Sequence, residues 1–229
     1  MSIYLVWERR AELGQLRPAP HWFGLLATLG FGGLWLVAGL GNVLVVQQIC
    51  VIGLLNAVAF AIYGPRVYVV LAFPLLTIFL VTPMWNVLEN PLRDLSTVVT
   101  HVVLEMLSMP VLLEGYEVTV PGGRFVIEPA CSGLGFFLCS GLIGAYFAYF
   151  NRLGLRQMGG FIVLGLALSI VANWIRILAI ITVGNATQMD HWIVDDHLFF
   201  GWLLFSGMLI PYFWAGNVLL NRWQPAFEA

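Results

Sequence analysis

The chain has 229 residues, of which 60% are apolar and 10% charged, and its mean hydropathy is +0.90. Soluble domains average about 45–50% apolar and about 25% charged residues, so this composition excludes an ordinary soluble protein. The net charge is −2, which gives no electrostatic reason to expect a nucleic-acid partner. Three cysteines are too few for a disulfide framework. We therefore predict an integral membrane protein, organised as a single membrane domain over residues 1–229.

Six apolar segments are candidates for transmembrane helices, because a helix needs about 20 residues to cross a bilayer core of about 30 Å. The first is long for a signal peptide and lacks a small-residue cleavage site, so we interpret it as a retained membrane anchor. The sequence thus predicts an all-α polytopic membrane protein with about six transmembrane helices. In chain order they are residues 22–40, 42–63, 67–83, 131–150, 159–184 and 198–220.

Residues 84–130 separate the third and fourth predicted spans, and their first part has the pattern of an amphipathic helix. Within 94–113, polar residues recur at intervals of three and four, which is typical of one narrow polar stripe on a helix. Two acids and a histidine are expensive in lipid, whereas a helix lying in the interface costs little. We therefore expect an interfacial helix, with a seventh span as the alternative. The stripe consists of Asp94, Thr97, His101, Glu105 and Ser108.

The second part of this segment has the pattern of a β-hairpin. Residues 116–128 alternate between apolar and polar around Pro121-Gly122-Gly123. Alternation on both sides of a glycine-containing turn predicts a short hairpin.

The arginines favour six spans over seven, because cytoplasmic loops carry an excess of positive residues. Six spans put seven arginines on the cytoplasmic side and two outside, whereas seven spans give five against four. Both termini are then cytoplasmic, and residues 84–130 are external. The seven inner arginines are Arg9, Arg10, Arg17, Arg66, Arg152, Arg156 and Arg222, and the two outer ones are Arg93 and Arg124.

Cys131 is the first candidate for chemistry, because it opens the fourth predicted span at its external end. The N-terminus of a helix favours the thiolate form, which is the nucleophile. Ser132 and Gly133 are small and leave room beside the sulfur for a peptide. The alternative is a small buried hydrophobe, the role that we assign to Cys50 and Cys139.

Arg176 and His197 lie near the same predicted face. Arg176 interrupts the apolar fifth span about 12 Å from Gly184 at helical rise. An intramembrane arginine usually faces a polar interior, and Asn173 lies one turn away on the same face; snorkelling is the alternative. His197 opens the sixth span and suits proton transfer. Its competitor is His191, and Asp195 and Asp196 are expected to orient the ring or cap the helix.

No cofactor or metal site is predicted. None of the 24 glycines builds a phosphate loop, and they suit close packing of membrane helices instead. His101 and Glu105 are four residues apart but supply only two metal ligands, which is weak evidence for a site.

Three ordered motifs resemble those of the exosortase/archaeosortase family. They are Glu-x-x-Cys-Ser-Gly at 128–133, Asn-x-x-Arg at 173–176 and His-x-x-x-Gly at 197–201, each in or at the end of a predicted span. The resemblance extends from about Leu71 to Leu220 and includes Phe73-Pro74-Leu75. Many members of the family have about eight spans, more than the six predicted for this chain.

The resemblance implies a polytopic cysteine protease or transpeptidase of the bacterial inner (plasma) membrane. Members recognise exported, membrane-anchored proteins by a C-terminal sorting signal: a motif such as Pro-Glu-Pro, a transmembrane helix and a basic cluster. They cut near the motif on the external face through a thioester. Cys131 would be the nucleophile, Arg176 the essential arginine and His197 the third catalytic residue. Glu128, Ser132 and Asn173 would support the site or bind substrate.

Two alternatives from other classes stay open. A small transporter or channel would use Arg176 as an anion site, although the sequence has neither the internal repeats nor the broken helices that indicate transporters. A non-catalytic membrane assembly subunit would leave Cys131 inert. In every case membrane lipid is an expected partner.

Overall fold

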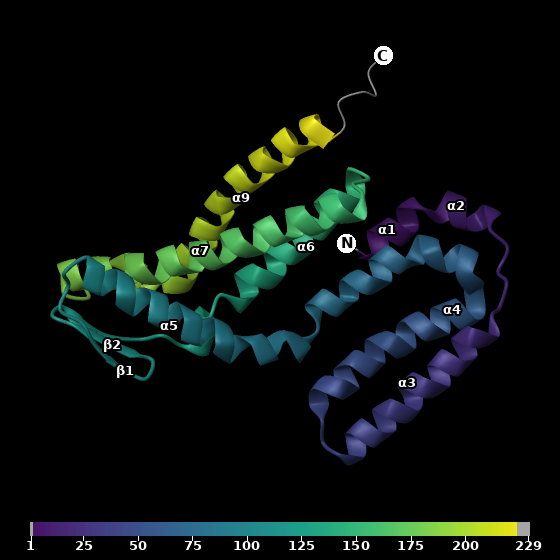
Figure 1. Ribbon diagram of the computed structural model, residues 1–229, viewed down its shortest axis with the longest axis horizontal. Coiled ribbons are helices and arrows are strands. Elements are labelled where there is room, and N and C mark those ends of the chain that lie inside the picture. Colours follow the sequence, from purple (N-terminus) through teal and green to yellow (C-terminus); the bar gives the residue numbers. More distant parts are fainter. Residues whose placement is uncertain (1, 224–229) are drawn as a thin grey trace. The chain divides into compact units, whose positions relative to one another are not determined.

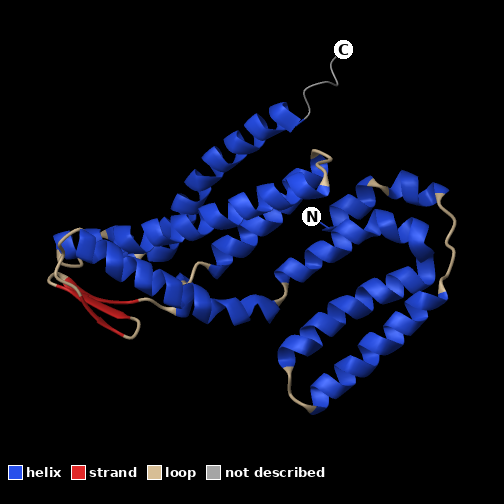
Figure 2. Ribbon diagram, in the orientation of Figure 1, coloured by secondary structure: helices blue, strands red, loops and turns tan. Residues whose placement is uncertain are grey.

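The computed structural model describes residues 2–223, and packing divides the chain into two compact units, with the boundary in the sequence between Trp85 and Asn86. Helices dominate both units, and the strands belong to the second (Figures 1 and 2). The prediction of a single membrane domain stays a prediction. The side chain of Arg222, used in the arginine count, lies outside the described residues.

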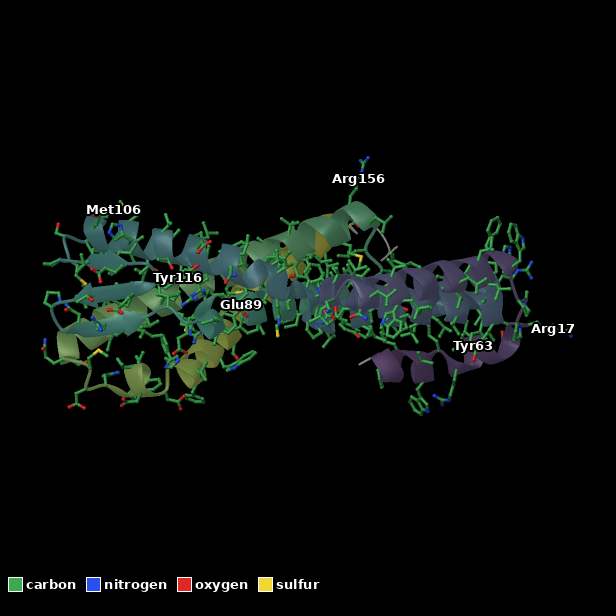
Figure 3. The ribbon with its side chains drawn as sticks, turned by 90° about the horizontal axis from the view of Figure 1, so that it is seen from below. Arg17, Tyr63, Glu89, Met106, Tyr116 and Arg156 are labelled. Carbon is green, nitrogen blue, oxygen red and sulfur yellow. The ribbon has the colours of Figure 1, made fainter. Side chains whose placement is uncertain are left out.

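The first unit consists of helices and short 3-10 turns. Its helix α3 has the bounds of the first predicted span. The second and third predicted spans lie in α4, which consists of two helices joined at Gly64. The backbone of Gly64 is not helical, with φ +74° and ψ 178°, and Pro65 follows it. Arg17 and Tyr63 lie at the same end of this unit (Figure 3), where the Tyr63 carbonyl accepts the Ala19 N–H. The elements are α1 (Ser2–Glu8), α2 (Arg10–Gln15), α3 (Trp22–Leu40), α4 (Leu44–Thr77), η1 (Ile78–Val81) and η2 (Pro83–Leu88), the last of which continues into the second unit.

The second unit is built around one long helix, α7. Helices α5, α6, α8 and α9 all pack against it. Its 33 residues span about 50 Å at helical rise, more than the bilayer core of about 30 Å. The helices are α5 (Glu89–Met106), α6 (Leu134–Phe150), α7 (Leu155–Thr187), α8 (Trp192–Asp195) and α9 (His197–Trp223).

Four stretches of the described chain are long and apolar enough to cross a membrane. They are Trp22–Leu40, Leu44–Val81, Leu155–Thr187 and His197–Leu220. The apolar helix α6 is shorter, with 17 residues, and the bent Leu44–Val81 contains two of the predicted spans. Helices that are long and apolar enough to span a membrane are thus confirmed, while the count of six stays a prediction.

The predicted amphipathic helix is present as α5, but it begins at Glu89 and ends at Met106 instead of running over 94–113. Ser108 has a positive φ of 55°, and Pro110 cannot continue a helix. The face of α5 that packs into the unit carries small hydroxyl residues, so only Thr97 of the predicted polar stripe is buried. The buried residues are Ser96, Thr97, Thr100 and Leu104, and the outward apolar ones include Leu95, Val98, Val102 and Met106.

The predicted hairpin is confirmed and belongs to a three-stranded antiparallel sheet of order β1-β2-β3. Its strands are β1 (Leu112–Glu114), β2 (Glu117–Val120) and β3 (Gly123–Val126). Strand β1 was not predicted, because its three residues carry no alternation of their own. One face of the sheet packs on α7 and shares a hydrophobic core with it. The sheet and the residue after it contribute Val118, Val120, Phe125 and Ile127, α5 contributes Leu104, and α7 contributes Ile177 and Ile181.

Polar contacts at both ends of the hairpin hold it in place. At the open end, the Arg93 guanidinium stacks on the Tyr116 ring, 3.5 Å from its centroid, and its Nε donates to the Ile127 carbonyl. The Tyr116 hydroxyl donates to Asp94 Oδ1 at 2.6 Å. In Figure 3, Tyr116 lies beside α5, between the labelled ends Glu89 and Met106. At the turn, the Gly122 N–H donates to Asn185 Oδ1 of α7 at 2.7 Å.

Candidate active site

Cys131 lies just before a helix and not within one. It ends the 3-10 turn η3 (Pro129–Cys131), in which its N–H donates to the Glu128 carbonyl at 2.8 Å. The expectation that Cys131 opens the helix of the fourth span is therefore corrected: α6 begins at Leu134. Gly133 separates turn and helix with a φ of +87°, a left-handed conformation that favours glycine.

Ser132 and Glu128 flank the cysteine in different ways. Ser132 is buried, and its Oγ accepts a hydrogen bond from the N–H of Leu134, the first residue of α6, at 3.3 Å. Glu128 is exposed and lines a cavity that Cys131 also lines.

Asn173 fixes the backbone of Cys131. Its side chain is 1% exposed, and Nδ2 donates to the Cys131 carbonyl at 2.9 Å and to Ser96 Oγ at 3.3 Å. A Cβ on Gly133 would lie 2.8 Å from Asn173 Cγ, so the amide also needs the glycine. Three elements, α5, η3 and α7, thus meet at one amide group.

Sequence reasoning missed Ser96. The predicted polar stripe runs through residues 94, 97, 101, 105 and 108, and Ser96 lies beside it. The available signal was the cluster of small hydroxyl residues Ser96, Thr97 and Thr100 in a valine-rich helix. Such residues let two helices approach closely.

Arg176 points into the protein and not toward the surface. It is 3% exposed, which argues against snorkelling, and its Nη2 lies 3.8 Å from Cys131 Sγ. A Cβ on Gly201 would lie 2.6 Å from Arg176 Nε, so this glycine of the third motif makes room for the guanidinium.

The charge of Arg176 has no carboxylate partner within ion-pair distance among the side chains that the structure describes. Buried cations in membrane helices are normally paired, because lipid and protein interiors solvate charge poorly. The contacting sulfur of Cys131 can itself become an anion. A thiolate there would pair with the guanidinium.

His197 and Cys131 line one cavity of about 200 Å³, together with Glu128. The structure also gives the neighbouring polar residues separate roles. Asp196 Oδ1 accepts the Phe199 N–H at 3.2 Å and so caps α9. His191 Nδ1 accepts the Ile193 N–H at 3.2 Å and so caps α8, which leaves His197 as the histidine at the cavity.

A second cavity, of about 160 Å³, is lined by the arginine. Its lining includes Arg176, Ala130 and Leu198. Ala130 and Leu198 are sequence neighbours of Cys131 and His197, which line the first cavity. Cys131 thus lines the first cavity and Arg176 lines the second, and the two side chains contact each other.

The fold and this site define a polytopic helical membrane protein in which a thiol, a guanidinium and an imidazole gather from three separate segments. The family model for transmembrane exosortases matches residues 1–214, and the chain belongs to that family. No curated protein and no solved structure matches it. Membership implies an integral membrane cysteine peptidase or transpeptidase connected with protein sorting, and a membrane protein substrate with a sorting signal.

Proposed function

We propose that this protein is an exosortase-like cysteine transpeptidase or endopeptidase that cleaves the C-terminal sorting signal of exported, membrane-anchored proteins on the external face. The observation that carries the proposal is the 3.8 Å contact between Cys131 Sγ and the buried Arg176 guanidinium, which pairs with none of the described carboxylates. His197 at the same cavity supplies a proton donor and acceptor. Family membership supports the reaction class.

In the first half of the reaction, the Cys131 thiolate attacks the scissile carbonyl carbon and forms a carbon–sulfur bond. The carbonyl electrons move to oxygen, and the Arg176 guanidinium donates hydrogen bonds to this oxyanion. The carbon–nitrogen bond then breaks, and His197 gives its proton to the departing amine. A thioester on Cys131 is left.

In the second half, an amine or a water molecule attacks the thioester carbonyl and loses its proton to His197. The carbon–sulfur bond breaks and the thiolate returns. If the attacking group is an amine, the protein is transferred to it through a new amide bond. If it is water, the protein is released with a free carboxylate. Asn173 serves both halves by holding the Cys131 backbone, so that the sulfur keeps its position next to Arg176.

The test uses a membrane-anchored protein with a C-terminal sorting signal, co-expressed from the source genome. Cys131→Ala and Arg176→Ala are each expected to abolish its processing at unchanged enzyme level. Cys139→Ala is the matched control, because Cys139 lies on α6 and lines neither cavity. Mass spectrometry of the wild type should find the substrate fragment as a thioester on Cys131.

Normal processing by both site variants would overturn the proposal. Flux through reconstituted liposomes that needs Arg176 but not Cys131 would assign the protein to the transporters instead. An unreactive Cys131 in a correctly folded protein would indicate the assembly subunit.

A further inference from the structure

Strand β3 has a free edge. The sheet order is β1-β2-β3, and within residues 2–223 only β2 pairs with β3. In an antiparallel ladder, alternate residues direct their N–H and C=O toward the partner strand. Ile127 donates to the Tyr116 carbonyl at 2.9 Å, so Phe125 also faces β2 while the backbone groups of Arg124 and Val126 face the free edge. Such an edge is a template for another strand.

The same strand forms one wall of the cavity of about 200 Å³ that contains Cys131. Every residue from Arg124 to Glu128 lines this cavity. The remaining walls are apolar apart from His197: Ile177, Ile180 and Ile181 come from α7, and Val194 comes from α8. The free edge therefore borders a groove and not open solvent alone.

The groove leads to the thiol. After β3 the backbone stays extended at Glu128, with φ −73° and ψ 161°, and the turn that ends at Cys131 follows directly. A peptide paired with Val126 needs only a few further residues to reach the sulfur, since an extended chain advances about 3.3 Å per residue.

We propose that the substrate binds as an added β-strand: an extended peptide segment beside the scissile bond pairs its backbone with β3 at Arg124 and Val126. This rests on the proposed function and names how that site holds its substrate. Main-chain hydrogen bonds supply binding that is independent of side-chain identity, and alternate side chains supply selectivity. The isoleucines of α7 select an aliphatic side chain at one of the alternate positions.

The probe is an acetylated tetra-alanine chloromethyl ketone, used on the purified full-length protein. The Cys131 sulfur bonds to its methylene carbon and chloride leaves. Two methylated versions carry N-methyl groups on the first and third amides from the ketone, or on the second and fourth. Iodoacetamide, which has no peptide to dock, is the reference reagent. Mass spectrometry follows alkylation at Cys131 separately from Cys50 and Cys139.

Strand pairing uses every second amide, so one methylated version should react about 3- to 10-fold more slowly than the parent peptide and the other at nearly the parent rate. Val126→Pro removes the outward N–H, and proline is tolerated on a strand edge. It should slow the parent peptide and leave the iodoacetamide rate unchanged. Val126→Ala shortens the same side chain but keeps the N–H, so it should react with the parent peptide faster than Val126→Pro does.

Equal rates for the two methylated versions in the wild type would overturn strand addition, and this comparison needs no variant to fold. Equal peptide rates for Val126→Pro and Val126→Ala would overturn it too. In both cases, alkylation of Cys131 by iodoacetamide leaves the proposed function standing. Failure of every reagent to modify Cys131 would overturn the proposed function, and strand addition with it.

Discussion

Single side chains carry the chemistry of this protein, and Arg176 is the one whose position is most constrained. It is buried, it contacts the Cys131 sulfur, and Gly201 leaves the space that its Nε occupies. A guanidinium presents a planar set of donors, whereas a lysine ammonium is a compact point charge. The proposed role of this residue therefore depends on the planar donor set of arginine and not only on its positive charge.

Arg176→Lys is accordingly expected to lower the rate of substrate processing by about 100-fold, the size of effect seen when an oxyanion donor is lost. The measurement is the rate of fragment appearance at equal enzyme level. Arg156→Lys is the control, because Arg156 is exposed near the start of α7 and points away from the helices (Figure 3). Processing by Arg176→Lys within about threefold of wild type would show that charge alone suffices.

Short elements position these side chains, and the connection between η3 and α6 is the critical one. Gly133 has a left-handed conformation and lies against Asn173, which holds the Cys131 carbonyl. Gly135, two residues later, has open space where a Cβ would be. Alanine substitutions at these two glycines can therefore distinguish local backbone strain at Gly133 from a general effect of alanine in this segment.

Gly133→Ala is expected to destabilise the fold by about 1–2 kcal/mol, because a non-glycine residue in this conformation is strained. It should also displace Asn173 and slow processing. Gly135→Ala should leave the free energy of unfolding unchanged, because a Cβ there meets no other atom. Thermal unfolding in detergent measures the change in stability, and the processing assay measures the change in rate. Equal melting temperatures for the two variants would show that the left-handed turn does not matter.

The hairpin is anchored to α5 by a titratable contact. The hydrogen bond from Tyr116 to the Asp94 carboxylate raises the pKa of Tyr116 above its usual value of 10.0, because only the protonated phenol can donate. The nearby charge of Arg93 acts in the opposite direction with a smaller effect. The contact therefore stabilises the fold fully below pH 10 and loses its contribution as pH rises through the raised pKa.

Asp94→Asn is expected to return the pKa of Tyr116 toward 10.0. The titration can be followed by NMR of ring-labelled tyrosine, with the Tyr116 signal assigned from its loss in Tyr116→Phe. An unchanged pKa in Asp94→Asn would show that the carboxylate is not the cause of the shift.

The predicted arrangement of the whole molecule in the membrane rests on the arginine distribution. Arg124, in β3, is predicted to be external, and Arg152, after α6, is predicted to be cytoplasmic. Helix α6 lies between them, and its 17 residues cover only about 26 Å. Helix α6 is thus shorter than the bilayer core of about 30 Å, and its crossing is the part of the six-span topology that most needs a test.

Cysteine replacement tests that crossing in a variant without the three native cysteines. Arg124→Cys is expected to react with a membrane-impermeant maleimide in intact cells, whereas Arg152→Cys and Arg66→Cys should react only after permeabilisation. All three arginines are exposed, so access to the side chain is not the limiting factor. The same labelling pattern for Arg124→Cys and Arg152→Cys would contradict the topology.

Local patterns in the sequence were enough to predict the membrane class, helix α3 to the residue, the β2–β3 hairpin and the family. Each depends on residues close together in the chain: apolar length, alternation, turn residues and motif order. The start of α6, the bounds of α5 and strand β1 differed from expectation or were missed. The left-handed Gly133 determines the start of α6, the positive φ of Ser108 follows the end of α5, and pairing with β2 defines β1. None of these features produces a periodic pattern in the sequence.

The proximity of Cys131 and Arg176, 45 residues apart in the chain, needed packing that no local pattern specifies. It depends on a 3-10 turn before α6, on Asn173 and Ser96 bridging three elements, and on a glycine of α9 that admits a guanidinium. Hydropathy indicates which residues avoid water, because the free energy of transfer into lipid or protein is a property of each residue by itself. Which buried groups touch depends on the shapes of several segments at once, and for that reason the site and its groove emerged only with the fold.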